Sequence, residues 1–360
     1  MLCWAWAHAA QEPHAFVPAG LDTDQRYSLV VDRVLTPLEE QHAFSVIRYD
    51  VGSLNLAELD EQVRRQDSQS GGRGNIAVLY PDISGPFQGV FGKIIEGIEA
   101  QLPGRVLSVP VAANVDAAEI NNQIKRSGAK VVIALGRQGL KTAASLDRDM
   151  PVVVGGVLSV PEADSRNLTG ISLTPDPALL FTRLKSLLPN VKRVFVVYDP
   201  QHNEWLMRLA RDAARAQGLE LVAYEAHDLA SALRLYAAVF AYTDGRRDAI
   251  WLPQDTTTVD DSAVLPLVLR ECWNRNVAFF SSSYLHVKKG ALFTLYPNNV
   301  ELGRTLAASA LGLLSGELRK RGMAPLREMH TAINLRTASH IGLNISYQQQ
   351  RSFDYVFPEP

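Results

Sequence analysis

The strongest constraint on the fold is a repeat that runs through most of the chain. Residues 76–82 and 194–200 each read as a buried strand that leads into a helical pattern. Third strands at 131–136 and 249–254 correspond at the same offset, since 194 − 76 and 250 − 132 both give 118. Repetition at this period predicts two similar lobes, each built from alternating strands and helices.

Fourth strands follow at residues 151–156 and 277–282, with a small insertion in the second copy. Apolar spacing predicts helices that include residues 204–217, 229–242, 264–275 and 299–314. Such alternation favours parallel sheets with right-handed crossovers. We therefore expect an α/β fold of two doubly wound parallel-sheet lobes joined by a three-crossing hinge. Extended runs place the crossings at residues 167–171, 290–296 and 332–335.

Composition and the repeat together divide the chain into five parts. In chain order we expect a remnant of an export signal (1–10), an N-terminal appendage with a polar linker (11–74), a first lobe (75–168 with 291–325), a second lobe (169–290 with 326–345) and a C-terminal tail (346–360). Ala7, His8 and Ala9 fit the small-x-small pattern of a signal-peptidase site. The charged segment that usually precedes such a site is missing. The alternatives are a start further upstream and an ordinary loose terminus.

Composition argues against several classes of protein. The formal net charge of −2 gives no electrostatic reason to expect a nucleic-acid partner. No apolar run reaches the roughly 18–20 residues of a membrane-spanning helix, so we expect no transmembrane segment. The two cysteines, Cys3 and Cys272, provide no disulfide framework and no cysteine metal site.

Catalytic motifs are missing from the sequence. It contains no phosphate-binding P-loop and no HExxH, GxSxG or GxGxxG pattern. The eight histidines are scattered without the spacing of metal ligands. Ser282, His286 and Asp255 form a triad only on paper, because His286 follows the serine too closely for the usual geometry. We therefore expect no enzyme, no cofactor and no metal site.

Candidate ligand-binding residues follow the predicted strands. In open parallel sheets, ligands bind beyond the carboxyl ends of the strands, where loops offer free N–H groups and helix N-termini. Two facing lobes bring both sets of loops around one cleft. The first-lobe candidates are Tyr80, Asp82, Ser84, Arg137, Gln138 and Gly156. The second-lobe candidates are Tyr198, Asp199, Asn203, Gln254, Asp255, Thr256, Ser282 and Tyr284.

Each candidate also has a plainer interpretation. Asp255 is placed to bind a ligand ammonium group, or else to make a local cap or turn. Tyr80 and Tyr198 occupy equivalent positions, where their rings either clamp a flat ligand or pack within the lobes. Arg137 either pairs with a carboxylate or is solvated. Asp199 precedes a proline and suits a turn.

Two hydroxyl side chains among the candidates have the same ambiguity. Ser84 and Thr256 either contact the ligand or cap the helices that follow them. The glycine at position 156 either permits close approach of the backbone to a ligand or only makes a tight turn. The sequence leaves these alternatives open.

Three pairs of runs carry a resemblance to a known family: 167–170 with 187–194, 287–292 with 301–304, and 333–338 with 341–343. They resemble ABC-transporter substrate-binding proteins of the type I periplasmic-binding-protein fold, whose better-understood members take aromatic amino acids. The resemblance covers about residues 75–345 and includes the order of all the elements. It implies an exported, periplasmic receptor that captures a small amino-acid-like ligand between its lobes and delivers it to an ABC permease.

Two other functions remain open at this point. A ligand-sensing or scaffold protein of the same fold would serve a sensor kinase or another membrane complex, and the appendage at 11–74 motivates this alternative. A cytoplasmic regulator's effector domain would need a DNA-binding helix pair. Residues 1–70 show no convincing basic recognition helix for that role.

Overall fold

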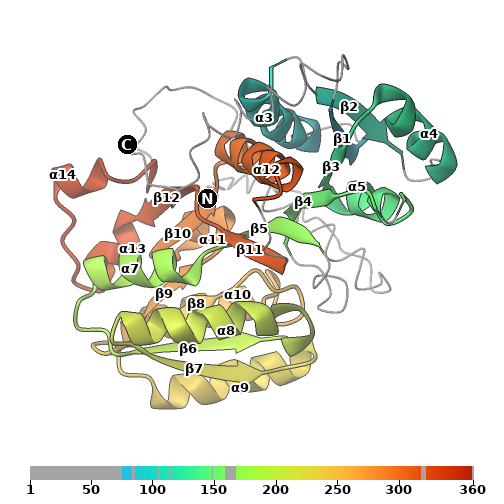
Figure 1. Ribbon diagram of the computed structural model, residues 1–360. Helices are drawn as coiled ribbons and strands as arrows, with labels where there is room; N and C mark the ends of the chain where they lie inside the picture. The colour runs from blue at the N-terminus through green and yellow to red at the C-terminus, as the bar shows by residue number, and fades with distance from the viewer. Residues whose placement is uncertain are drawn as a thin grey trace, which may run out of the picture.

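The computed structural model contains two β-sheets, each covered by its own helices, which are joined at a central junction (Figure 1). It describes residues 75–82, 86–103, 106–112, 116–147, 149–158, 168–317 and 322–358. The expectations for the export signal, for the appendage at 11–74 and for Ser84 lie outside the described residues.

The first sheet forms what we call the first lobe. Its strands lie in the order β2-β1-β3-β4-β5-β11, and all its pairs are parallel: β1 (Ile76–Pro81), β2 (Val106–Val111), β3 (Val131–Leu135), β4 (Val152–Val157), β5 (Thr169–Pro175) and β11 (Gly322–Leu326). Helices α3 (Pro86–Gln101) and α12 (Asn299–Leu314) cover one face. Helices α4 (Ala117–Ser127) and α5 (Gly136–Ala143) cover the other.

The second sheet forms the second lobe. Its order is β7-β6-β8-β9-β10-β12-β13: β6 (Arg193–Tyr198), β7 (Glu220–Glu225), β8 (Asp248–Leu252), β9 (Ala278–Ser281), β10 (Phe293–Pro297), β12 (Met329–Asn334) and β13 (Tyr355–Phe357). Only the β10–β12 pair is antiparallel among the strands described. Helices α7 (Pro177–Leu187) and α8 (Pro200–Ala216) cover one face, and α9 (Leu229–Tyr242) and α10 (Val264–Arg275) the other.

The strand orders confirm the two doubly wound lobes. The run β2-β1-β3-β4-β5 in the first sheet corresponds strand for strand to β7-β6-β8-β9-β10 in the second. The expected C-terminal tail is more structured than we predicted. It holds the short helix α14 (Tyr347–Gln350) and then β13, which pairs with β12 at the edge of the second sheet.

Capping residues decide where the helices begin. Helices α9, α10 and α12 have the bounds that the apolar spacing predicts. Helix α8 begins earlier than the expected residue 204, because the Asp199 carboxylate accepts a hydrogen bond from the Gln201 N–H at 2.9 Å and Pro200 occupies the first helical position.

Two of the crossings between the lobes come later in the chain than the sequence suggested, and the third, expected at 332–335, comes earlier, between β11 and β12. The extended run from Thr169 is strand β5, which pairs with β4 and buries Ile171 and Leu173 in the first lobe. The run from Phe293 is strand β10, which pairs with β9 and belongs to the second sheet. Alternating apolar residues therefore make these runs core strands, and the chain crosses only after each strand ends.

Backbone hydrogen bonds tie the crossings together. The Asp176 N–H, which follows β5, donates to the Leu326 carbonyl at the end of β11 over 2.9 Å. The Asn298 N–H, which follows β10, donates to the Glu328 carbonyl over 3.2 Å. Asp176 and Asn298 also cap α7 and α12. The three crossing segments therefore lie side by side at one junction, as a hinge requires.

Two glycines bring α12 back against the first lobe, where Figure 1 shows it beside α3. A Cβ atom at Gly303 would lie 2.0 Å from the Ile94 carbonyl oxygen, and one at Gly97 would lie 2.0 Å from the Val300 carbonyl oxygen. Only residues without a side chain permit this contact between the two backbones. Below it, apolar side chains of both helices form one core with β1, β3 and β4.

We predict that Gly303→Ala destabilises the protein by about 2 kcal/mol or more, because the added methyl group forces α12 away from α3. The control is Gly92→Ala in helix α3, the partner of α12, where an added Cβ meets nothing within 4 Å. It should stabilise by about 0.5–1 kcal/mol through helix propensity. Urea unfolding measures both, and equal effects would contradict the close packing of the helices.

A second prediction concerns Glu328 at the hinge. Burial raises the pKa of the Glu328 carboxyl, and the nearby Glu301 carboxylate adds to the effect. The folded protein therefore binds the proton of Glu328 more tightly than the unfolded chain does. The contribution of the protonated carboxyl to stability is present below the unfolded-state pKa and is lost as pH rises through the folded-state pKa. Glu328→Gln should raise the melting temperature at pH 7.5 but not at pH 4. The exposed Glu317→Gln serves as control, and a pH-independent effect of Glu328→Gln would refute the prediction.

Candidate functional site

The carboxyl edges of both sheets adjoin the hinge. The chain leaves β5 at its carboxyl end to enter α7 of the second lobe, and leaves β10 at its carboxyl end to enter α12 of the first lobe. The other parallel strands of each sheet end on the same side. The loops that the sequence singled out therefore lie on the edges that face the junction, where ligands bind in folds of this kind.

Glycines draw the strand ends of the first lobe together. Gly136 follows β3 with φ of 65°, and a Cβ there would lie 3.0 Å from the Pro81 Cγ atom at the end of β1. Gly156 in β4 has φ of 68°, and its Cβ would lie 3.3 Å from the Gly136 nitrogen. Both φ values belong to the left-handed region that glycine tolerates without strain. The carboxyl ends of β1, β3 and β4 are thus packed against one another.

Two residues of opposite charge follow these adjoining strand ends, Asp82 directly after β1 and Arg137 in the first turn of α5. The β1–β3 register ends at the pair Leu79 and Ala134, and Asp82 and Arg137 each come three residues after it. Both residues are exposed, and Gln138 beside them is half-buried. The Asp82 N–H donates to the Val111 carbonyl over 2.9 Å, which fixes the loop backbone while the carboxylate stays accessible.

The second-lobe edge is organised around the buried carboxylate of Asp255. One of its oxygens accepts hydrogen bonds from the Asp199 N–H at 2.7 Å and from the Asn203 amide at 2.9 Å. The other accepts from the N–H groups of Thr257 at 2.9 Å and Thr258 at 3.1 Å. Burial raises the pKa of this carboxyl, and these donors oppose the shift. Both oxygens are already occupied by protein donors. The geometry therefore favours a structural role, in which Asp255 holds the loops together, over contact with the ammonium group of a ligand.

Asp199 completes the connection between the two loops of this edge. Its carboxylate accepts from the Gln201 N–H and from the Thr257 hydroxyl, each at 2.9 Å, and lies 3.2 Å from His202 Nδ1. The Thr258 hydroxyl donates to the Val197 carbonyl over 3.1 Å. The loops after β6 and β8 are therefore one hydrogen-bonded unit, with Thr256 half-buried on it.

Tyr198 does not fit the expected ring clamp. Its side chain has no exposed surface and belongs to the core under α8, where its hydroxyl donates to Glu204 at 2.7 Å. Burial raises its pKa further above the ordinary value. The predicted symmetry with Tyr80 therefore fails, because Tyr80 is half-buried at the first-lobe edge and Tyr198 is enclosed.

Three other second-lobe candidates also have internal partners. Ser282 is fully buried, and its carbonyl accepts from the Gln254 amide at 2.7 Å. The Trp251 indole N–H points to the Ser282 hydroxyl over 3.3 Å. Tyr284 packs edge-on against Tyr296, with ring centroids 5.1 Å apart. These contacts give the three residues structural roles at the ends of β8 and β9.

A serine, a histidine and an aspartate do align around His286, but the partners are Ser281 and Asp261 and not the Ser282 and Asp255 that the sequence suggested. Ser281 Oγ lies 2.6 Å from His286 Nδ1, and His286 Nε2 lies 3.1 Å from Asp261. Burial acts to raise the pKa of Asp261, but the His286 and Lys289 side chains hold it well below its usual range. Ser281 has no exposed surface, so a substrate cannot reach its hydroxyl. These three side chains tie α11 (Tyr284–Lys289) to the end of β9 and do not form a nucleophilic site.

A family model described as "ABC transporter substrate binding protein" matches residues 110–350. The chain belongs to this family. The match confirms the resemblance drawn from the sequence, and it extends over both lobes. A search of curated proteins finds no significant match to this substrate-binding protein.

One of the solved structures that are similar to this substrate-binding protein supports its fold. The ligand-free, open structure of a substrate-binding protein with adhesive properties from Clostridium difficile is 16% identical, with a TM-score of 0.53, and the match covers 78% of this chain and 98% of that chain. A conserved domain protein from Vibrio cholerae is 20% identical, covering 79% and 99%, with a TM-score of 0.49. An ABC domain in complex with L-Trp from Streptococcus pneumonia is 18% identical, covering 79% and 100%, with a TM-score of 0.49.

The sequence missed part of the second-lobe network of this substrate-binding protein. Thr257, Thr258 and His202 were not among the candidates, although Thr257 bonds to both Asp199 and Asp255, Thr258 to Asp255 and His202 to Asp199. A usable signal was present, since an aspartate followed by threonines favours local hydrogen bonds to the backbone. In the described part of the chain, no helix has the length and apolarity to cross a membrane.

We predict that Asp255→Ala destabilises the protein by about 2–5 kcal/mol, because it leaves four buried donors without their acceptor. The matched control is Asp212→Ala on α8, whose side chain is exposed and should change stability by less than about 0.5 kcal/mol. Chemical denaturation of both variants measures the difference. Similar losses would show that the Asp255 network does not stabilise the fold.

Proposed function

We propose that this substrate-binding protein captures a small amino-acid-like ligand between the carboxyl edges of its two lobes and delivers it to an ABC permease outside the cytoplasm. The observation that carries the proposal is the exposed pair of opposite charges at the first-lobe edge, Asp82 directly after β1 and Arg137 in the first turn of α5. A zwitterion presents a carboxylate and an ammonium group a few ångströms apart, which matches such a pair.

In this proposal the first lobe provides the specific contacts. Arg137 binds the ligand carboxylate with a bidentate guanidinium contact, and Gln138 adds a hydrogen bond. Asp82 takes the ammonium group, since the Asp255 carboxylate is already saturated by protein donors. Gly156 allows close approach of the backbone, and the half-buried Tyr80 ring contacts the apolar body of the ligand.

The second lobe acts as the other wall of the site. Its hydrogen-bonded unit of Asp199, Asn203 and Asp255 holds Thr256 in a fixed position, where its hydroxyl contacts the ligand when the lobes close. We take the moving bodies to be residues 75–175 with 299–326, and 177–297 with 329–358. Closure follows because the ligand touches both lobes only in the closed form and so shifts the population towards it.

We predict that at least one L-amino acid raises the melting temperature in a screen of amino acids and small organic acids. For the amino acid that binds, Arg137→Gln and Asp82→Asn should each weaken affinity about tenfold or more, because each removes a charge-assisted hydrogen bond. Isothermal titration calorimetry measures the affinities.

The matched control is Arg126→Gln, an exposed arginine on α4 of the same lobe but away from the carboxyl edge. It should leave affinity unchanged. The proposal is wrong if no compound of the screen stabilises the protein, or if the Arg126 and Arg137 variants lose affinity equally.

A further inference from the structure

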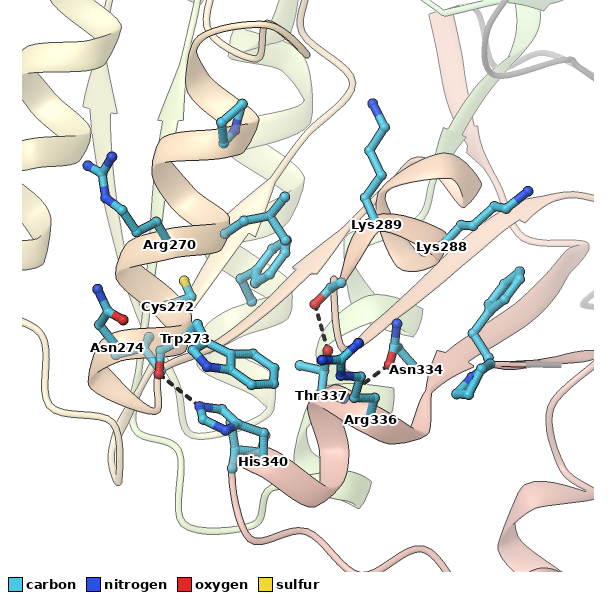
Figure 2. Close-up of a pocket in the computed structure, with 18 residues that line it drawn as sticks. Arg270, Cys272, Trp273, Asn274, Lys288, Lys289, Asn334, Arg336, Thr337 and His340 are labelled. Carbon is cyan, nitrogen blue, oxygen red and sulfur yellow. Dashed lines mark hydrogen bonds between the residues drawn. The ribbon is translucent and has the colours of Figure 1, made fainter. Parts of the chain in front are cut away.

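A pocket of about 800 Å³ lies in the second lobe, far from the hinge. Its walls come from α10, from the end of α11, from α13 (Leu335–His340) and from the end of β13, as Figure 2 shows. Among its lining residues, Val277 immediately precedes β9 and Gly290 comes shortly before β10, so the pocket lies at the amino ends of these strands. The hinge adjoins their opposite, carboxyl ends. The pocket is therefore separate from the proposed interlobe site.

The inner surface of this pocket is apolar. Val277, Phe279 and Phe357 line it and are buried in the lobe, and Leu269 of α10 is half-buried beside them. Pockets of roughly 300–1,000 Å³ with apolar walls and a few polar groups are typical of sites for small organic molecules.

An exposed indole forms one side of the pocket. Trp273 keeps 42% of its surface exposed, although tryptophan side chains are usually well buried. Its ring stacks on His340 with centroids 3.5 Å apart and planes 7° apart, and His340 Nε2 lies 2.8 Å from the Trp273 carbonyl oxygen. The imidazole of His340 thus covers one face of the indole ring. Figure 2 shows the stacked pair at the mouth of the space between α10 and α13.

The charged side chains that line the pocket are all positive. Arg270, Lys288, Lys289 and Arg336 line it, and no aspartate or glutamate does. Arg270 lies 3.2 Å from Glu271, and Lys289 lies 3.2 Å from Asp261. Lys288 and Arg336 form no ion pair with any residue that the structure describes. The Arg336 guanidinium carbon lies 5.9 Å from the centre of the Trp273 ring, so a cation and an aromatic face are presented together.

We propose that this pocket is a second binding site, specific for aromatic carboxylates. The aromatic part of the ligand stacks on the open face of Trp273 and covers the apolar wall, and the carboxylate pairs with Arg336 and Lys288. Neither a cation nor a neutral hydrocarbon matches this arrangement, because the first is repelled by the unpaired charges and the second leaves them unused. The inference goes beyond the proposed interlobe function and does not depend on it.

The test uses 2-naphthoate and its neutral analogue 2-naphthamide in isothermal titration calorimetry with the full chain. 2-Naphthoate should bind at one site, and 2-naphthamide should bind at least tenfold more weakly. Arg336→Gln and Trp273→Ala should each weaken 2-naphthoate binding at least tenfold. Trp273→Phe, which keeps an aromatic face, should retain more of the affinity than Trp273→Ala. Arg336 and Trp273 are both exposed, so these variants should fold.

Two controls separate this proposal from the interlobe site. Arg234→Gln removes an exposed arginine of α9 outside the pocket and should leave 2-naphthoate binding unchanged. Arg137→Gln, at the first-lobe edge, should also leave it unchanged. The pocket proposal is overturned if 2-naphthoate does not bind up to 1 mM, or if Arg137→Gln abolishes binding and Arg336→Gln does not. If 2-naphthoate binds although no amino acid stabilises the protein, the pocket proposal is supported and only the interlobe proposal is wrong.

Discussion

The close contact between α3 and α12 determines how the two lobes are joined. Gly97 and Gly303 let the two helix backbones approach so closely that α12 completes the core of the first lobe, although the chain reaches it from the second sheet. That return forces the chain to cross the junction again after β10 and after β11. Two of the three crossings that make up the hinge are therefore a consequence of this one contact.

The two carboxyl edges at the junction differ in character. On the second lobe, Asp199 and Asp255 join two loops into a buried network in which the protein's own donors satisfy the carboxylates. On the first lobe, Asp82 and Arg137 are exposed beside strand ends that glycines hold together. In the proposed function, the first lobe recognises the charges of the ligand, and the second lobe contacts the ligand when the lobes close.

The sequence predicted the elements of the fold better than it predicted the roles of single residues. Periodicity gave the lobes and the bounds of α9, α10 and α12, because burial patterns are local. It could not show that Tyr198 is enclosed. A strand that is covered on both faces is apolar along its whole length, so the pattern does not distinguish a core residue at its end from one that faces a ligand. Nor could it show that Asp255 is saturated, because two of its partners, Asp199 and Asn203, are more than 50 residues away in the chain.

The central claim is that a ligand closes two lobes about a common hinge. Small-angle X-ray scattering tests it most directly, with the protein alone and with a saturating amount of an amino acid that stabilises it. Closure predicts a smaller radius of gyration in the presence of the ligand. An unchanged radius of gyration at full occupancy would contradict the account, since the ligand would then bind without bringing the lobes together.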